Sequence, residues 1–70
     1  MVHNVSVVPC SVKLPEYKKT VDFWDWMGER RIGSLHKVHT NEGVFDFFIE
    51  YKTGYCFSPV KEVSYWKQRN

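Results

Sequence analysis

The 70-residue sequence predicts a small, mainly antiparallel β domain, folded as a five-stranded barrel or as a strongly curled sheet, with one short helix as an option. The main observation is the run 30–58, which contains two long segments and one shorter segment of extended type. They are separated by Asn41-Glu42-Gly43 and by Thr53-Gly54, both typical of turns. β-Branched and aromatic residues dominate these segments, and a chain of this length has room for one domain only. We therefore expect a three-stranded antiparallel meander at the centre of the fold.

The middle segment of the meander has a clear two-residue period. One face carries Phe45, Phe47, Ile49 and Tyr51, and the other carries Val44, Asp46, Phe48, Glu50 and Lys52. Because the first set is wholly aromatic or aliphatic, this pattern predicts that the first face belongs to the core.

The first strand of the meander has a weaker pattern, and one further strand is expected at the amino terminus. In 32–39 neither alternate face is purely apolar, which indicates a strand near an edge or one that bends. Val5–Val8 is short and β-branched, and we expect a strand there that Pro9 closes.

Two stretches allow either a helix or a strand. In 15–27, Pro15 suits a first helical turn and Tyr17, Val21 and Trp24 form a helical stripe, yet 20–26 is rich in β-formers. In 58–68, Ser58-Pro59 favours a helix start, whereas Val63 and Tyr65 alternate as in a strand. If helices form, the fold becomes α+β, with a three-stranded antiparallel meander packed against one or two helices.

The run 31–63 resembles the small SH3-like barrels of the Tudor and KOW type. It has their order of an Ile-Gly-x-Leu strand at 32–35, a Gly-bearing hairpin, an aromatic strand and a Gly-Tyr strand at 54–55 before a last strand. The resemblance implies a five-stranded SH3-like barrel. It implies no ligand-binding residues, since none aligns with the aromatic cages of that family.

A second resemblance covers residues 57–66. The pattern Phe57-Ser58-x-x-Lys61-Glu62-Val63-x-x-Trp66 is similar to the strand-to-helix junction of the arm-binding domains of tyrosine recombinases, where the open face of a sheet reads DNA. We do not extend the DNA-reading role to this chain, because its open face would carry Asp46 and Glu50, which repel phosphate.

Composition narrows the function classes. Ten Lys and Arg against eight Asp and Glu give a net charge of +2, which permits nucleic-acid binding without requiring it. The amino terminus lacks the features of a signal peptide and no run is long enough to span a membrane, so we expect a cytoplasmic, stand-alone protein. Cys10 and Cys56 are then expected to be free thiols and not a disulfide.

No pattern for catalysis or for a cofactor is present. His36 and His39 lie three apart on a predicted strand and therefore point to opposite faces, which argues against a metal pair. The four glycines are spaced as turns and caps, and no nucleophile adjoins a base. The sequence predicts a protein that is not an enzyme and has no metal or cofactor.

Aromatic and basic residues are the remaining functional candidates. Trp, Tyr and Arg are the types enriched at interface hot spots. We expect a non-catalytic interaction module, a stand-alone regulator or inhibitor that docks on a protein partner; the alternative is a nucleic-acid binder that uses Arg30, Arg31 and the neighbouring aromatic rings. The candidate binding residues are Trp24, Trp26, Arg30, Arg31, Tyr55, Trp66 and Lys67.

Trp26 is the best candidate among them. On a helix it would point away from the stripe of Tyr17, Val21 and Trp24. On a strand, residues 21–27 present bulky side chains to both faces, and one face has to stay outside. The segment therefore exposes a large apolar side chain in either form, and we expect Trp26 with Arg30 and Arg31 to form the docking patch.

Overall fold

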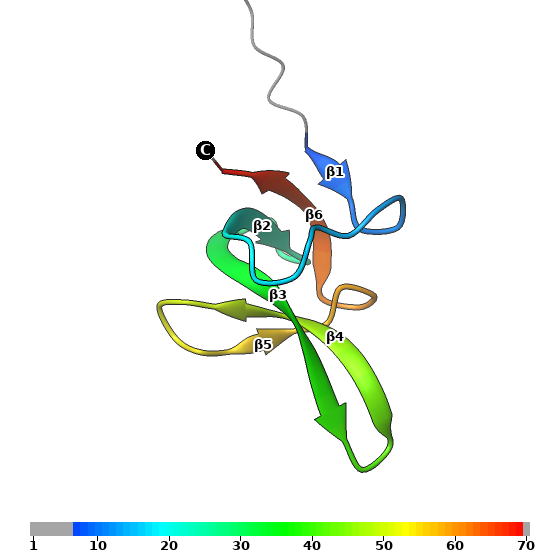
Figure 1. Ribbon diagram of the computed structural model, residues 1–70. Helices are drawn as coiled ribbons and strands as arrows, with labels where there is room; N and C mark the ends of the chain where they lie inside the picture. Colours follow the sequence, from blue (N-terminus) through cyan, green and yellow to red (C-terminus); the bar gives the residue numbers. More distant parts are fainter. Residues whose placement is uncertain (1–6, 70) are drawn as a thin grey trace, which may run out of the picture.

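The computed structural model describes residues 7–69, which form one antiparallel sheet and no helix (Figure 1). The strands of the described chain are β1 (Val8–Pro9), β2 (Val21–Asp25), β3 (Arg30–Thr40), β4 (Gly43–Glu50), β5 (Cys56–Phe57) and β6 (Val63–Gln68). Their order in the sheet is β1-β6-β2-β3-β4-β5. Since β1 and β5 form the two edges and do not pair with each other, the fold is the curled sheet and not the closed barrel, with six strands where five were expected.

The predicted meander is confirmed as β3, β4 and β5. The β3–β4 ladder runs from the pair Thr40↔Gly43 at the turn to Gly33↔Glu50 at the far end. The short strand β5 then returns along β4 with Phe57 opposite Phe48. The turn at 41–42 and the bend at 51–55 lie where the polar, glycine-bearing segments predicted them.

Neither ambiguous stretch forms a helix. β2 is a central strand, paired with β3 on one side and with β6 on the other. In the other stretch, the amide of Ser58 donates to the Glu62 carboxylate (2.8 Å) and the amide of Glu62 donates to the Ser58 carbonyl (2.7 Å). This turn leads directly into β6. The α+β alternative is therefore wrong, and so is the helix implied by the recombinase resemblance of 57–66.

The amino-terminal strand is present but shifted from its expected position. β1 pairs Val8 with Trp66 and Pro9 with Tyr65. Pro9 is the last residue of β1, so the strand ends at the proline as expected, and the edge position tolerates the missing N–H group because no described strand lies on its open side. Half of the predicted strand, Val5 and Ser6, lies outside the described residues.

The predicted core face of β4 is wrong. Phe48 and Glu50, with 0% and 6% of their surface exposed, point inward. Phe45 and Tyr51 are exposed instead, at 44% and 55%. The pattern misled because a charged residue lies on the buried face, and Glu50 tolerates burial there because Arg31 on β3 donates to its carboxylate at 3.0 Å.

The curled sheet covers its own inner face. The ring of Phe23 on β2 stacks on Phe48 (centroids 4.8 Å apart) and meets the edge of Phe57 (5.6 Å), so β2, β4 and β5 meet across the curl. The segment between β1 and β2 packs against this face at Leu14, and the Trp66 indole N–H donates to the Lys13 carbonyl at 2.8 Å. The buried apolar cluster consists of Val21, Phe23, Leu35, Phe48, Phe57, Val63 and Trp66.

The curl requires a close approach of β3 and β4 at Gly33. A Cβ atom at this position would overlap the carbonyl oxygen of Ile49 and lie 3.1 Å from the Cα of Glu50. Glycine is therefore needed at this point, where β3 bends between its pairing with β2 and its pairing with β4 (Figure 1). Of the two alternatives predicted for this strand, an edge position or a bend, Figure 1 shows the bend, and the half of β3 beyond Gly33 also lies at an edge.

We expect Gly33→Ala to lower the free energy of unfolding by about 2–4 kcal/mol, because backbone atoms have to move to admit the methyl group. Urea denaturation followed by tryptophan fluorescence measures this loss. Gly28→Ala is the matched control: no atom lies within 4 Å of the added Cβ, so only the cost of its positive φ of 83° applies, about 1 kcal/mol. Equal losses for the two variants would contradict a close approach of the two backbones at Gly33.

Candidate functional site

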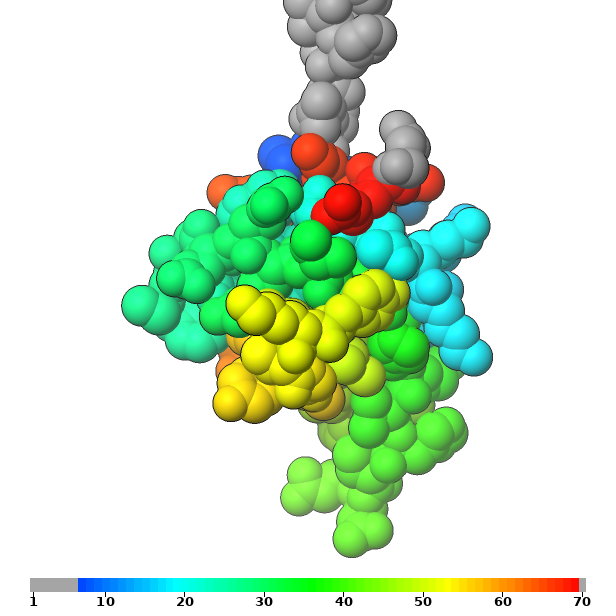
Figure 2. Space-filling model, turned by 90° about the vertical axis from the view of Figure 1, so that its left-hand side faces the viewer, coloured from blue at the N-terminus to red at the C-terminus, as the bar shows by residue number. Residues whose placement is uncertain are grey.

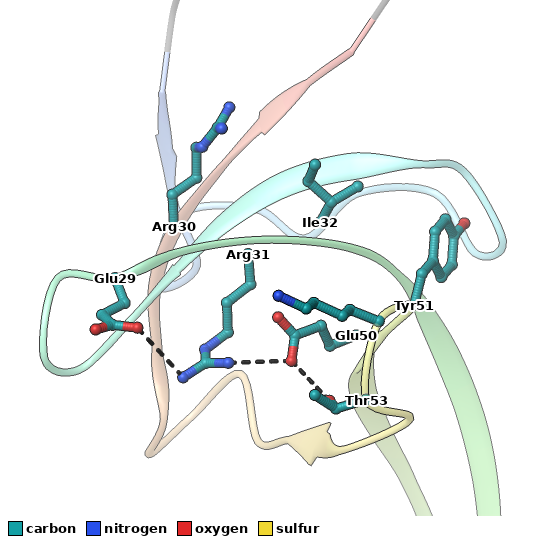
Figure 3. Close-up of a pocket in the computed structure, with 8 residues that line it drawn as sticks. Glu29, Arg30, Arg31, Ile32, Glu50, Tyr51 and Thr53 are labelled. Atoms are coloured by element: carbon teal, nitrogen blue, oxygen red, sulfur yellow. Dashed lines mark hydrogen bonds and ion pairs between the residues drawn. The ribbon is translucent and has the colours of Figure 1, made fainter.

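Arg31, one of the predicted docking residues, lies on the inner face of β3 and binds three carboxylates. Its Nε donates to Asp25 at 2.9 Å, one terminal nitrogen donates to Glu50 at 3.0 Å, and the other lies 3.8 Å from Glu29. Figure 3 shows the guanidinium between Glu29 and Glu50. Its carbon also lies 4.7 Å from the ring centroid of Phe57. Arg31 therefore joins β2, β3, β4 and β5 and is not available to a partner.

Asp25 organises the turn between β2 and β3. One carboxylate oxygen accepts the amides of Met27 and Glu29, each at 2.9 Å, and the other accepts Arg31. Burial alone would raise the pKa of Asp25. The hydrogen bonds from the Glu29 amide, from Arg31 and from the Met27 amide outweigh it and hold this pKa below its ordinary value. Asp25 is thus a buried, ionised carboxylate with a structural role.

A hollow of about 600 Å³ lies beside these ion pairs, lined by Glu29, Arg30, Arg31, Ile32, Glu50, Tyr51, Lys52 and Thr53. Its inner charged groups are already bonded to each other: Glu50 accepts both Arg31 (3.0 Å) and the Thr53 hydroxyl (2.7 Å), as Figure 3 shows. Arg31, Glu50 and Thr53 are therefore used in bonds within the fold.

The opposite, outer face of the sheet carries aromatic and basic side chains on β2, β3 and β6. Trp24 and Tyr65 are cross-strand partners whose ring centroids lie 5.1 Å apart. Arg30 is the partner of Trp24 on the other side, and Lys67 is the partner of Asp22. We call this surface the β2–β6 face and define it by Asp22, Trp24, Arg30, Tyr65, Lys67 and Arg69.

Asp22 lies at the centre of the cations on the β2–β6 face. Its side chain is 5% exposed and accepts a hydrogen bond from Arg69 at 2.9 Å, with Arg30 at 3.7 Å and Lys67 at 4.0 Å. The cations remain accessible, with 41%, 58% and 31% of their side-chain surface exposed, respectively. Three cations around one carboxylate leave an excess of positive charge on this face.

The structure brings together some of the predicted binding residues and separates others. Trp24, Arg30 and Lys67 share the β2–β6 face. Trp26 is 59% exposed on the turn after β2, so its predicted exposure is confirmed. Tyr55 is 65% exposed in the bend between β4 and β5.

Two of the predicted binding residues, Trp66 and Arg31, do not lie on an outer binding surface. Trp66 belongs to the buried core, with 7% of its surface exposed. Arg30 and Arg31 are consecutive on a strand, so they point to opposite faces of the sheet, and the patch of Trp26 with both arginines does not form.

Sequence reasoning missed Asp22, Tyr65 and Arg69 as members of the β2–β6 face. Strand alternation could have placed Tyr65 beside Lys67 once 63–68 was taken as a strand. No local signal pairs Asp22 with Arg69, because they are separated by 47 positions.

The thiols and imidazoles supply no additional site in the described residues. Cys10 and Cys56 are both free, as expected, and burial raises the pKa of the Cys10 thiol to about 11. His36 bonds the Ser34 hydroxyl at 2.7 Å. Within 7–69 no three His, Cys, Asp or Glu side chains gather in a way that could hold a metal ion, and this part of the chain has no helix that could cross a membrane.

Removal of the positive charge of Arg31 should destabilise the fold. We expect Arg31→Gln to lower the free energy of unfolding by about 3 kcal/mol, because it leaves Asp25 and Glu50 buried without their ionic partner. Arg30→Gln is the matched control on the adjacent, exposed position, with an expected change within about 0.5 kcal/mol. Urea denaturation at pH 7 measures both, and a similar small change for the two variants would contradict the role of Arg31.

The free energy of unfolding should also depend on pH through the ionisation of Asp25. Since its pKa is lower in the folded protein than its ordinary value of 3.8, the ionised form stabilises the folded state. This contribution is complete above the ordinary value and is lost as pH falls through the lower, folded value. We expect the urea midpoint to decrease at acid pH in the wild type and to decrease less in Asp25→Asn. An acid profile unchanged by the substitution would contradict this assignment.

Comparisons with protein-family models, with curated proteins and with solved structures find no match to this chain. They therefore neither support nor oppose the SH3-like resemblance of 31–63. The case for a function comes from the contacts and exposed surfaces of the described residues.

Proposed function

We propose that this protein is a non-catalytic interaction module, a regulator or inhibitor that docks on a protein partner through the β2–β6 face and the adjoining Trp26. The observation that carries this proposal is the contact of the Trp24 and Tyr65 rings, tilted by 34° to each other, with Arg30, Lys67 and Arg69 around it.

The aromatic part of the face suits a protein interface. Trp24 and Tyr65 are each half-buried and pack against one another, so a partner can bury large ring surfaces that are already held in place. Trp26 adds a largely exposed indole on the turn next to β2. Rings held in place before binding lose little conformational entropy, which is why Trp and Tyr recur at interface hot spots.

The charge of the face indicates the partner's surface. Arg30, Lys67 and Arg69 are all accessible, and Asp22 balances only one of them. A protein surface with exposed carboxylates complements this excess, and such complementarity accelerates association. We therefore expect an acidic patch on the partner.

Nucleic acid is a weaker candidate. Of the two arginines expected to contact phosphates, Arg31 is bound to carboxylates on the inner face. On the outer face, Asp22 lies among the cations and would lie beneath a bound phosphate backbone. Protein therefore remains the favoured partner.

The charge excess gives the first test. We expect immobilised wild-type protein to retain a protein partner about tenfold more tightly than Arg30→Gln/Lys67→Gln, measured on the recovered complex by biolayer interferometry. Arg69 is left in place so that Asp22 keeps its hydrogen bond. Lys52→Gln/Lys61→Gln removes the same charge from exposed turns and should bind as the wild type does. Recovery of nucleic acid alone, with affinity that decreases steeply with salt, would contradict the proposal.

The exposed indole gives a second test on the same complex. Trp26→Ala should weaken binding by about 2 kcal/mol, as truncation of an interface hot spot does, with a melting temperature close to that of the wild type. Tyr55→Ala removes an equally exposed ring at the β4–β5 bend and should leave affinity unchanged. A large loss of melting temperature in Trp26→Ala would instead give Trp26 a role in the core.

A further inference from the structure

We propose that the β3–β4 hairpin is a second binding element, and that the free edge of β3 at Lys37 and His39 accepts an extended, acidic segment of a partner protein as an added strand. This inference concerns a different surface from the β2–β6 face. It rests on the unpaired backbone of the edge, the charges beside it and the half-exposed apolar residues of the hairpin.

The hairpin extends beyond the rest of the domain (Figures 1 and 2). β3 pairs with β2 only over Arg30–Gly33, whereas its pairing with β4 continues to Thr40. Among the described residues, the far half of β3 therefore has a strand neighbour on one side only. A row of unpaired N–H and C=O groups is a template for another strand.

The backbone direction along this edge follows from one hydrogen bond. The amide of Lys18 donates to the carbonyl of Leu35 at 2.9 Å, so Leu35 points its carbonyl away from β4. In an antiparallel ladder every second residue directs both backbone groups to the same side. Lys37 and His39 therefore direct their N–H and C=O groups to the open edge, and each can bond an incoming strand.

The chain itself already begins such a pairing. Tyr17 forms a parallel bridge with Leu35, but Lys18 has a φ of 66°, which turns the backbone away from the edge. The segment that starts to extend the sheet thus leaves after a single bridge. The positions that follow along β3, Lys37 and His39, pair with β4 on one side and have no strand neighbour on the other side among residues 7–69.

Charge distinguishes between the possible occupants of this edge. Lys18, Lys37 and His39 are all exposed beside it, and the Lys37 ammonium lies 5.3 Å from the ring centroid of Tyr17. Asp46, the cross-strand partner of Lys37, accepts the Tyr17 hydroxyl at 2.7 Å and offsets one of these charges, so an excess of positive charge remains beside the edge. Two copies paired along this edge would bring their lysines together, which like charges oppose, whereas a segment with Asp or Glu would match them.

The other face of the hairpin is apolar. Val38 and Phe45 are cross-strand partners, and Phe47 lies two residues further along β4. Phe45 is 44% exposed and, with Phe47, lines a shallow hollow at the tip. A strand added beside β3 would place one set of alternate residues next to Val38 and the other set next to Lys37 and His39. The best fit is therefore an extended segment that alternates apolar and acidic residues.

The test uses a fluorescein-labelled peptide of alternating Glu and Val, with a peptide of alternating Lys and Val as its control. We expect fluorescence anisotropy to show binding of the Glu peptide, and amide hydrogen exchange to slow at Lys37 and His39. Lys37→Glu should weaken binding about tenfold by reversing the charge. Lys37→Pro should do the same by removing an outward N–H group, which an edge strand tolerates.

Three controls establish whether the peptide binds at this edge. Lys52→Glu makes the same charge change away from the hairpin and should bind normally. Arg30→Gln/Lys67→Gln should also bind normally, so failure of the β2–β6 face and failure of this edge are distinguishable. Circular dichroism checks that Lys37→Pro is folded; if it is not, Lys37→Glu decides the outcome.

Four results would overturn the proposal. They are no binding of the Glu peptide, equal binding of the Lys peptide, wild-type affinity in Lys37→Glu, and sedimentation of a dimer in which exchange at Lys37 and His39 is already slow. The last result would assign the edge to a second copy of this chain.

Discussion

The guanidinium of Arg31 is the interaction on which the fold depends most. A single sheet has no second layer to cover its apolar side, so it has to curl until its own strands meet. Arg31 lies inside that curl and binds Asp25 on β2 and Glu50 on β4. Gly33, two residues further along β3, lets the strands approach closely enough for these bonds and for the contact of Phe23 with Phe48. The ion pairs and the aromatic core therefore require the same curvature.

The same architecture explains why the two proposed binding surfaces lie on the outside. In a small one-layer domain, the residues that cover the inner face leave few apolar residues to cover the outer face. Aromatic side chains there stay half-exposed, as Trp24 and Tyr65 do on the β2–β6 face and Phe45 does on the hairpin. Both surfaces carry accessible cations, so both favour acidic partners, although through different groups: side chains on the β2–β6 face, and backbone groups on the β3 edge.

Neighbouring residues of one strand divide structural and proposed binding roles between them. Arg31 points inward and holds the fold, whereas Arg30 points outward and is accessible. On β4, Phe48 fills the core while Phe47 lies on the outer side of the hairpin. The two-residue period of a strand makes this division unavoidable, and it allows the two functions to be separated by single substitutions.

The sequence by itself determined the β class, the meander and its turns, and the exposure of Trp26, because these follow from local propensity, glycine-bearing turns and strand alternation. It did not determine that 21–25 and 63–68 are strands, since their helical patterns are outweighed only by pairing with each other and with β3. Nor did it determine which face of β4 is buried. A charged residue such as Glu50 is expected to be exposed to solvent, and only the contact with Arg31 explains its burial. The cluster of Asp22 with Arg69 likewise arises only when residues 47 positions apart become neighbours. Tertiary structure decided these points because a buried or clustered charge depends on partners that the local sequence does not name.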